Sequence, residues 1–187
     1  MPRLKKYNEQ EVIEKAMNLF WKQGFENTSM QMLENEMGIN KFSIYSSFGS
    51  KNGIFLESLN CYKKKLYQLL SSLRKNSSHI EDIKQYFYDF IAFSQEAGIK
   101  KGCLITNTAG EIREDADAQI KQTLKEFTEE VRTIFSNILK KDSNKSNEIV
   151  NQQADYLIIS MFGLSMASRI FNPSQLDNYI LNIFRNL

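Results

Sequence analysis

The chain has 187 residues, of which 42% are hydrophobic, 25% charged and 12% aromatic, as in an ordinary globular protein. A single histidine and two distant cysteines exclude sites that need two imidazoles or a C-x-x-C pair, and no glycine-rich phosphate loop occurs. The net charge is +2, but residues 1–75 hold 12 Lys and Arg against 7 Asp and Glu, so the remainder is net acidic. We therefore expect a polyanion-binding module beside a second module, with no metal, no cofactor and no enzymatic activity. No apolar run approaches the ~20 residues of a membrane span and no signal peptide is found, which predicts a cytoplasmic protein without membrane contact.

The first predicted elements are two helices separated by a glycine. Apolar residues at positions i, i+3, i+4 and i+7 place a helix over residues 9–23, and Gly24 ends it by adopting a left-handed conformation. Thr28 is the expected N-cap of the second helix, because Gln31 three residues later completes a capping box. This second helix extends to Gly38, the next break.

Two further N-caps follow at short intervals. Asn40 is expected to cap a very short helix that ends at Ser47, and Ser50 to cap a long helix that begins at Lys51. This order of short helices forms a helix-turn-helix arrangement, in which the last short helix fits the major groove of DNA, about 12 Å wide. We therefore predict a DNA-binding domain over residues 1–50 and a second domain over residues 51–187. The alternative is a helical domain that happens to contain a tight turn.

The rest of the chain is also predicted to be helical and without strands, so the expected fold class is all-α. Polar residues, glycines or Pro173 bound each apolar stripe, and Pro173 is expected to stop one helix before Ser174 caps the next. The expected helices cover residues 80–96, 103–113, 116–140, 147–170 and 174–187.

A pattern of specific residues at fixed spacing runs through residues 9–60. The residues that carry it are Ile13, Ala16, Leu19, Phe20, Gly24, Phe25, Thr28, Ser29, Leu33, Gly38, Ile39, Asn40, Lys41, Ile44, Tyr45, Phe48, Ser50 and Lys51. The pattern resembles the N-terminal domain of TetR-family transcriptional repressors. The segments Tyr45–Lys51 and Gly102–Ala109 are similar to a subgroup with Tyr-x-x-Phe-Gly-x-Lys and Gly-Cys-Leu-x-x-Asn-Thr-Ala. The resemblance implies a homodimer that binds a pseudo-palindromic operator in double-stranded DNA and is released by an unknown small-molecule effector.

Candidate DNA contacts follow from the resemblance and from the chemistry of the side chains. The resemblance implies backbone contacts for Thr28, Tyr45 and Lys51, and helix N-termini and phenol hydroxyls are suitable partners for phosphate. For base readout we expect lysine to bind guanine, phenylalanine a thymine methyl and serine either partner of a base pair. The candidate DNA-facing residues are Thr28, Asn40, Lys41, Phe42, Ser43, Tyr45, Ser46 and Lys51. A basic arm of Arg3, Lys5 and Lys6 either adds sequence-independent affinity or is a solvated terminus.

The resemblance also implies an effector pocket among the middle helices. The candidate pocket residues are Tyr62, Tyr86, Phe87, Phe90, Phe93, Cys103 and Phe127, although aromatic residues at helical spacing also build plain cores. Cys103 follows two lysines and opens a predicted helix, which favours a thiolate that senses thiol-reactive compounds. The alternative is that Cys103 is a small buried hydrophobic residue.

The last two helices are expected to form the dimer interface. Small residues permit close helix approach and apolar residues supply area, as in a two-fold four-helix interface. The candidate interface residues are Leu157, Ser160, Met161, Gly163, Leu164, Ala167, Ile180 and Phe184. Such a dimer places two recognition helices ~34–36 Å apart, one turn of DNA. The alternative functions are a small helical enzyme and a helical small-molecule-binding or interaction protein without DNA binding.

Overall fold

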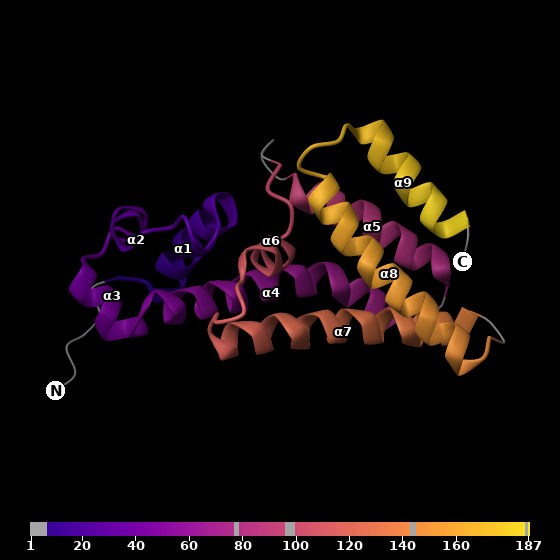
Figure 1. Ribbon diagram of the computed structural model, residues 1–187, viewed down its shortest axis with the longest axis horizontal. Coiled ribbons are helices and arrows are strands. Elements are labelled where there is room, and N and C mark those ends of the chain that lie inside the picture. The colour runs from indigo at the N-terminus through magenta and orange to yellow at the C-terminus, as the bar shows by residue number, and fades with distance from the viewer. Residues whose placement is uncertain (1–6, 77–78, 96–99, 143–144, 186) are drawn as a thin grey trace.

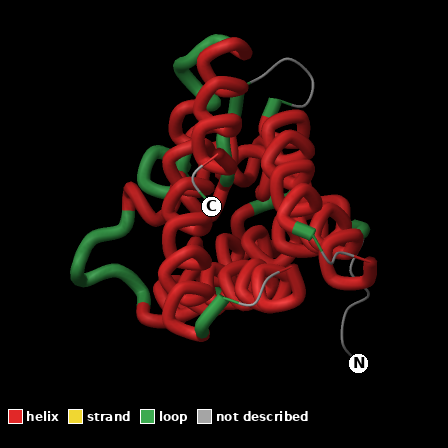
Figure 2. Tube along the Cα trace, turned by 90° about the vertical axis from the view of Figure 1, so that its right-hand side faces the viewer, coloured by secondary structure: helices red, strands yellow, loops and turns green. Residues whose placement is uncertain are grey.

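The computed structural model describes residues 7–76, 79–95, 100–142, 145–185 and 187. This part of the chain is helical, and Figure 2 shows helices joined by loops with no strand among the described residues, which confirms the all-α prediction. The basic arm of Arg3, Lys5 and Lys6 lies outside the described residues. The helices are α1 (Glu9–Gln23), α2 (Met30–Met37), α3 (Lys41–Phe48), α4 (Lys51–Asn76), α5 (Ile80–Ser94), α6 (Leu104–Glu111), α7 (Ala118–Asp142), α8 (Asn147–Ala167) and α9 (Pro173–Arg185).

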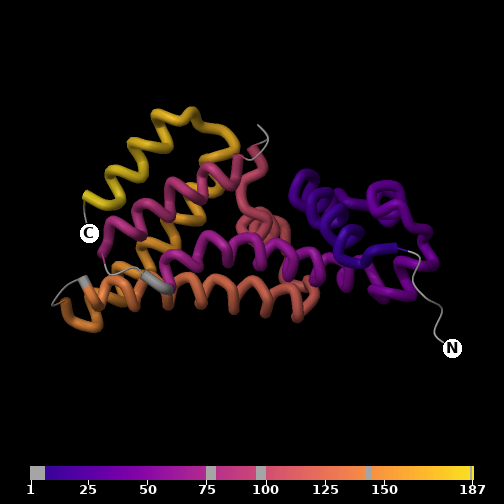
Figure 3. Tube along the Cα trace, turned by 180° about the vertical axis from the view of Figure 1, so that it is seen from behind, coloured from indigo at the N-terminus to yellow at the C-terminus, as the bar shows by residue number. Residues whose placement is uncertain are grey.

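The helices form two units joined by α4. At one end α1, α2 and α3 gather around the start of α4. Farther along, α5 and α7 pack against α4, α8 packs on α7, and α9 lies against α8 and α5 (Figure 1). The long helix α4, with 26 residues and a length of about 39 Å, belongs to both units. α6 lies between them, in contact with α1, α4 and α8, and the view from behind shows the same order (Figure 3). A helical N-terminal unit and a helical C-terminal bundle were both predicted.

Each unit has its own buried aromatic centre. In the N-terminal unit, the rings of Phe20 and Phe55 pack edge to face, with centroids 4.9 Å apart. Ile44 is completely buried and anchors α3 on this centre, because it is the single buried residue of that helix. In the C-terminal unit the ring of Phe87 packs against Phe135 at 6.2 Å. The short α3 is thus held by one apolar side chain, and most of its surface is left to face outward.

The predicted N-cap of α2 is wrong by one residue. Ser29 is the N-cap, and its hydroxyl oxygen accepts the Met32 amide at 3.2 Å. The Thr28 hydroxyl instead donates to the Gly24 carbonyl at 2.6 Å and is buried. Thr28 therefore closes the end of α1, a local bond that threonine makes readily, and the capping box with Gln31 does not form.

The start of α9 also differs from the prediction. Pro173 is the first residue of α9, a position where the missing N–H of proline costs nothing. The side-chain oxygen of Asn172 accepts the Gln175 amide at 3.0 Å, so Asn172, not Ser174, closes the helix start. The preceding helix α8 accordingly ends at Ala167, three residues before the predicted limit.

Candidate nucleic-acid interface

The recognition helix α3 presents a polar and aromatic outer face. Its N-cap Asn40 accepts the Ser43 amide at 2.8 Å, as predicted. Opposite the buried Ile44, the side chain of Phe42 is 79% exposed. The DNA-facing candidates Asn40, Lys41, Phe42, Tyr45 and Ser46 are exposed, and Ser43 is half-buried. The arrangement suits major-groove entry, because the anchor points inward and donor groups and a large ring point outward.

The first turn of α3 is occupied by a carboxylate from α2. The backbone amide of Lys41 donates to Glu34 Oε1 at 2.9 Å. This contact and the Asn40 cap on the Ser43 amide satisfy two of the N–H groups at the helix start, so those two amides are not available to a phosphate. The ammonium of Lys41 lies 5.9 Å from the centre of the Tyr45 ring, so the two groups neighbour each other on the outer face. Sequence reasoning missed Glu34, since its capping role spans a turn and follows no fixed spacing.

Two expected phosphate contacts are altered by the structure. Thr28 is buried beneath Gly24 and does not stand at the start of α2, so the exposed Ser29 takes the position that attracts phosphate. The Lys51 ammonium lies 4.4 Å above the Phe25 ring and donates to the Glu26 carbonyl at 3.5 Å. Burial lowers the pKa of Lys51, while the carboxylates of Glu26 and Glu111 act in the opposite direction. The contact of Lys51 with DNA stays a prediction.

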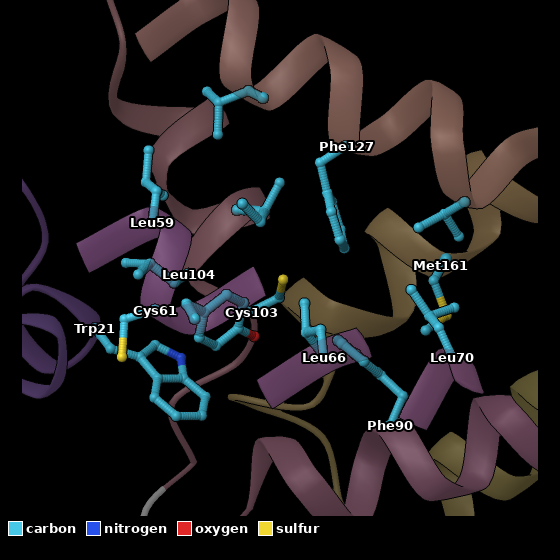
Figure 4. Close-up of a cluster of buried hydrophobic side chains, with 14 of the residues drawn as sticks. Trp21, Leu59, Cys61, Leu66, Leu70, Phe90, Cys103, Leu104, Phe127 and Met161 are labelled. Atoms are coloured by element: carbon cyan, nitrogen blue, oxygen red, sulfur yellow. The ribbon is translucent and has the colours of Figure 1, made fainter. Parts of the chain in front are cut away.

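A small apolar cavity lies between α4, α5, α6, α7 and α8. Its volume is about 30 Å³, room for one water-sized sphere. Figure 4 shows Phe90, Phe127 and Met161 around the same interior region as Cys103. The lining residues are Leu66, Tyr86, Phe90, Cys103, Ile105, Thr106, Phe127, Thr128, Val131, Ile158, Met161 and Phe162.

Four of the predicted pocket residues line this cavity and three do not. Tyr86, Phe90, Cys103 and Phe127 line it. Tyr62, Phe87 and Phe93 are not among the lining residues. Phe87 packs in the core against Phe135 and Phe184, and Phe93 stacks on Trp21 with ring centres 5.4 Å apart. These three rings belong to the packed core, which was the alternative to a role in the effector pocket.

Of the two alternatives for Cys103, the structure supports the small buried hydrophobic residue. Its side chain is buried, and burial raises the pKa of the thiol. The two lysines that were expected to activate it lie elsewhere: the Lys101 ammonium lies 4.6 Å over the Trp21 ring, and that of Lys100 donates to the Phe171 carbonyl at 3.2 Å. Cys103 is thus a buried hydrophobic residue, and its amide is tied to the Ser165 hydroxyl at 3.0 Å.

The predicted dimer residues mostly face the interior of the protomer. Ala167 and Phe184 are half-buried, and Gly163 alone of the predicted set is exposed. The residues that are buried within the protomer are Leu157, Ser160, Met161, Leu164 and Ile180. Their apolar periodicity therefore reflects packing of α8 and α9 within one chain, which leaves little of these five side chains open to a second copy.

A second apolar stripe lies on the opposite side of α8. We call it the outer stripe, and it consists of Tyr156, Ile159, Gly163, Met166 and Ile170. The side chains of Ile159 and Ile170 are 70% and 79% exposed. From Tyr156 to Met166, within α8, the spacing alternates between three and four residues, the repeat of a helix that packs along another helix, and Ile170 follows in the turn after the helix. Sequence reasoning missed the stripe because α8 is apolar on both faces.

The sequence of the N-terminal unit is similar to a known family. Residues 12–58 match the family described as bacterial regulatory proteins, tetR family. The N-terminal unit is a TetR-family domain. The match ends inside α4, so this helix leaves the TetR-family domain and continues into the C-terminal bundle, and the predicted boundary after residue 50 stays a prediction.

The chain is also similar to two HTH-type regulators and to solved structures of the same fold. YezE, an uncharacterized HTH-type transcriptional regulator of Bacillus subtilis, is 29% identical over 58% of this chain, and the matched region spans only 57% of YezE. IcaR, the negative transcriptional regulator of the biofilm operon icaADBC of Staphylococcus aureus, is 24% identical over 66% of this chain and 67% of its own. A cysteine mutant of the TetR family regulator CifR, complexed with 26-bp operator DNA, has a TM-score of 0.83 and 21% identity, over 98% of this chain and 97% of that one. The whole chain thus has a TetR-like fold.

No helix in the described part of the chain is both long enough and apolar enough to span a membrane.

Proposed function

We propose that the protein is a transcriptional repressor that binds a pseudo-palindromic operator as a homodimer and is released by a small molecule. The observation that carries the proposal is the outer face of α3, where Phe42, Lys41 and Tyr45 are exposed in a domain that matches the TetR family. The negative regulation named for IcaR and the operator complex of CifR support the same role. A repressor of this kind would act on chromosomal DNA in the cytoplasm and would need no catalytic site.

The outer stripe supports the homodimer. Two copies of the protein that pack along their outer stripes would remove Ile159 and Ile170 from water. Exposed apolar side chains in line along one helix are the usual sign of an interface rather than of a free surface. The two recognition helices would then be related by a two-fold axis, as a pseudo-palindrome requires.

The cavity supports an effector that is apolar and uncharged. None of the residues that line it is ionised at neutral pH, so a charged ligand would be buried without a counter-charge, at a cost of several kcal/mol. With about 30 Å³ of free space, any ligand larger than water must part the helices that close the cavity. Benzyl alcohol and benzoate differ mainly in charge, so benzyl alcohol is expected to raise the melting temperature of the protein at concentrations where benzoate has no effect.

The decisive experiment selects bound fragments from random duplex DNA with the purified protein. A pseudo-palindromic consensus with half-sites about one turn apart supports the repressor. A reporter gene under that sequence then distinguishes repression from activation. If no sequence is enriched, the repressor proposal is refuted. If no duplex is retained even at low salt, DNA binding itself is refuted, and the protein is a helical interaction or small-molecule-binding protein.

A further inference from the structure

The segment 102–117, which contains α6, holds the N-terminal unit at three places. The indole N–H of Trp21 donates to the Gly102 carbonyl at 3.1 Å in a buried contact. At the far end, Asn52 on α4 donates to the Asp117 carboxylate at 2.9 Å. The third contact is made by Glu111, at the last residue of α6, and it reaches the turn between α1 and α2. Figure 3 shows α6 against the N-terminal unit from behind.

The Glu111 carboxylate accepts two backbone hydrogen bonds from the turn between α1 and α2. The amides of Phe25 and Glu26 donate to Glu111 Oε2 at 2.7 and 3.3 Å. Both amides follow the end of α1, and a charged acceptor makes such bonds stronger than a neutral one. A Cβ atom at Gly24 would collide with the same carboxylate, and the φ of Gly24 is +86°, so the turn accepts Glu111 because this position is glycine. The nearby Lys51 ammonium adds favourable charge.

The opposite end of α6 belongs to the wall of the cavity. Cys103, Ile105 and Thr106 line the cavity, and the Thr106 hydroxyl lies 2.6 Å from that of Ser165 on α8. α6 has eight residues and a length of about 12 Å, so it acts as a single rigid piece. The start of α6 is hydrogen-bonded to α8 of the bundle, and the last residue of α6 carries the carboxylate that binds the N-terminal unit.

We propose that Glu111 is a positioning residue that sets the orientation of the TetR-family domain on the bundle, and through it the spacing of the half-sites that the dimer accepts. The assignment rests on the proposed function. Adding one base pair between half-sites moves them by about 3.4 Å and rotates them about the DNA axis. A TetR-family domain held at three places cannot easily reorient to bind half-sites at a new spacing. A domain that has lost the Glu111 contact with the α1–α2 turn can reorient more easily.

The experiment measures the affinity for an operator selected by the parent protein and for versions with one base pair more or fewer between the half-sites. The variants are Glu111→Ala and Glu111→Gln, with Glu114→Ala as control, because Glu114 is an exposed acid three residues away. For the parent, the selected spacing is expected to bind at least about tenfold more tightly than the others. Glu111→Ala is expected to reduce this preference to about threefold or less without changing binding to random duplex DNA. Glu111→Gln keeps a side-chain oxygen that accepts both amides and is expected to retain the preference, as is Glu114→Ala.

Amide hydrogen exchange at Phe25 and Glu26 tests the contact itself, and both amides are expected to exchange about tenfold faster in Glu111→Ala. The assignment is overturned if Glu111→Ala keeps the spacing preference of the parent, or if it weakens all duplexes equally, random DNA included. If the parent selects an operator and either result is found, only the role of Glu111 is lost. If the parent selects no duplex at all, the proposed function fails and this assignment fails with it.

Discussion

Replacing Phe42 by alanine is expected to separate DNA affinity from protein stability. The side chain is 79% exposed, so it contributes little to the core. A phenylalanine presents about 200 Å² of surface, which leaves roughly 160 Å² open to a partner. If half of that area is covered in the major groove, about 80 Å² at ~25 cal/mol per Å² is worth about 2 kcal/mol for each half-site. For a dimer on two half-sites the sum is about 4 kcal/mol, roughly a thousandfold in dissociation constant.

The assay is a mobility-shift titration of Phe42→Ala against the selected operator at fixed salt, with the melting temperature measured in parallel. The melting temperature is expected to stay the same. Ile44→Ala is the matched control, because Ile44 is the buried anchor of the same helix and its loss is expected to lower stability first. Replacing individual thymines by uracil removes the methyl group that Phe42 is expected to contact, and it should weaken the parent but not the variant. A loss of less than about tenfold in Phe42→Ala would refute this estimate of the contact.

Three further predictions concern charge, assembly and pH. Lys51→Ala is expected to weaken binding to all duplexes and to lower the slope of log affinity against log salt by about 1 per half-site, whereas an unchanged slope would exclude a phosphate contact. Ile159→Glu is expected to weaken the dimer about a hundredfold in sedimentation measurements, because it places a carboxylate in an apolar interface. Lys125→Glu, at an exposed position of α7, serves as control, and a dimer of parental strength in Ile159→Glu would exclude the outer stripe as the interface. Burial raises the pKa of Cys103 and of Tyr86 in the folded protein, so their protons are held more tightly than in the unfolded chain. Their contribution to the free energy of unfolding should therefore be constant below the unfolded thiol pKa of 9.0 and fall as the pH rises above it. Denaturant titrations up to pH 11 check this for Cys103→Ala against the parent, and an equal alkaline loss of stability in both would contradict a contribution from the buried thiol.

The architecture of the N-terminal unit followed from local signals that the structure confirms. Asn40 and Ser50 cap helices where they were expected, because a cap depends on a side chain and amides two or three residues away. Thr28 failed as a cap for a physical reason. Thr28 and Ser29 have equal chemistry for the role, and burial of Thr28 under the end of α1 decided between them. Local spacing contains no information about that burial.

The errors in the C-terminal bundle have a different origin. Periodicity identified Leu157 and Leu164 as apolar positions of α8 but not the partner that they face, and here the partner is the same chain. The chemistry expected for Cys103 depended on where two lysine side chains point, and both make contacts elsewhere. Glu111 binds a turn 85 residues or more earlier in the chain, so its role could be found only after folding brought the two segments together.

If two copies pair along the outer stripe as proposed, the stability of the protein depends on its concentration. In the proposed dimer, a protomer whose Ile159 and Ile170 face water would gain free energy when it meets a second copy, and this gain would grow with the logarithm of concentration. The melting temperature should accordingly rise on concentrating the sample. In a cell, newly made chains would be the least stable members of the population until they find one another. Turnover by proteases would then fall most heavily on unpaired chains and favour a low, steady number of complete dimers.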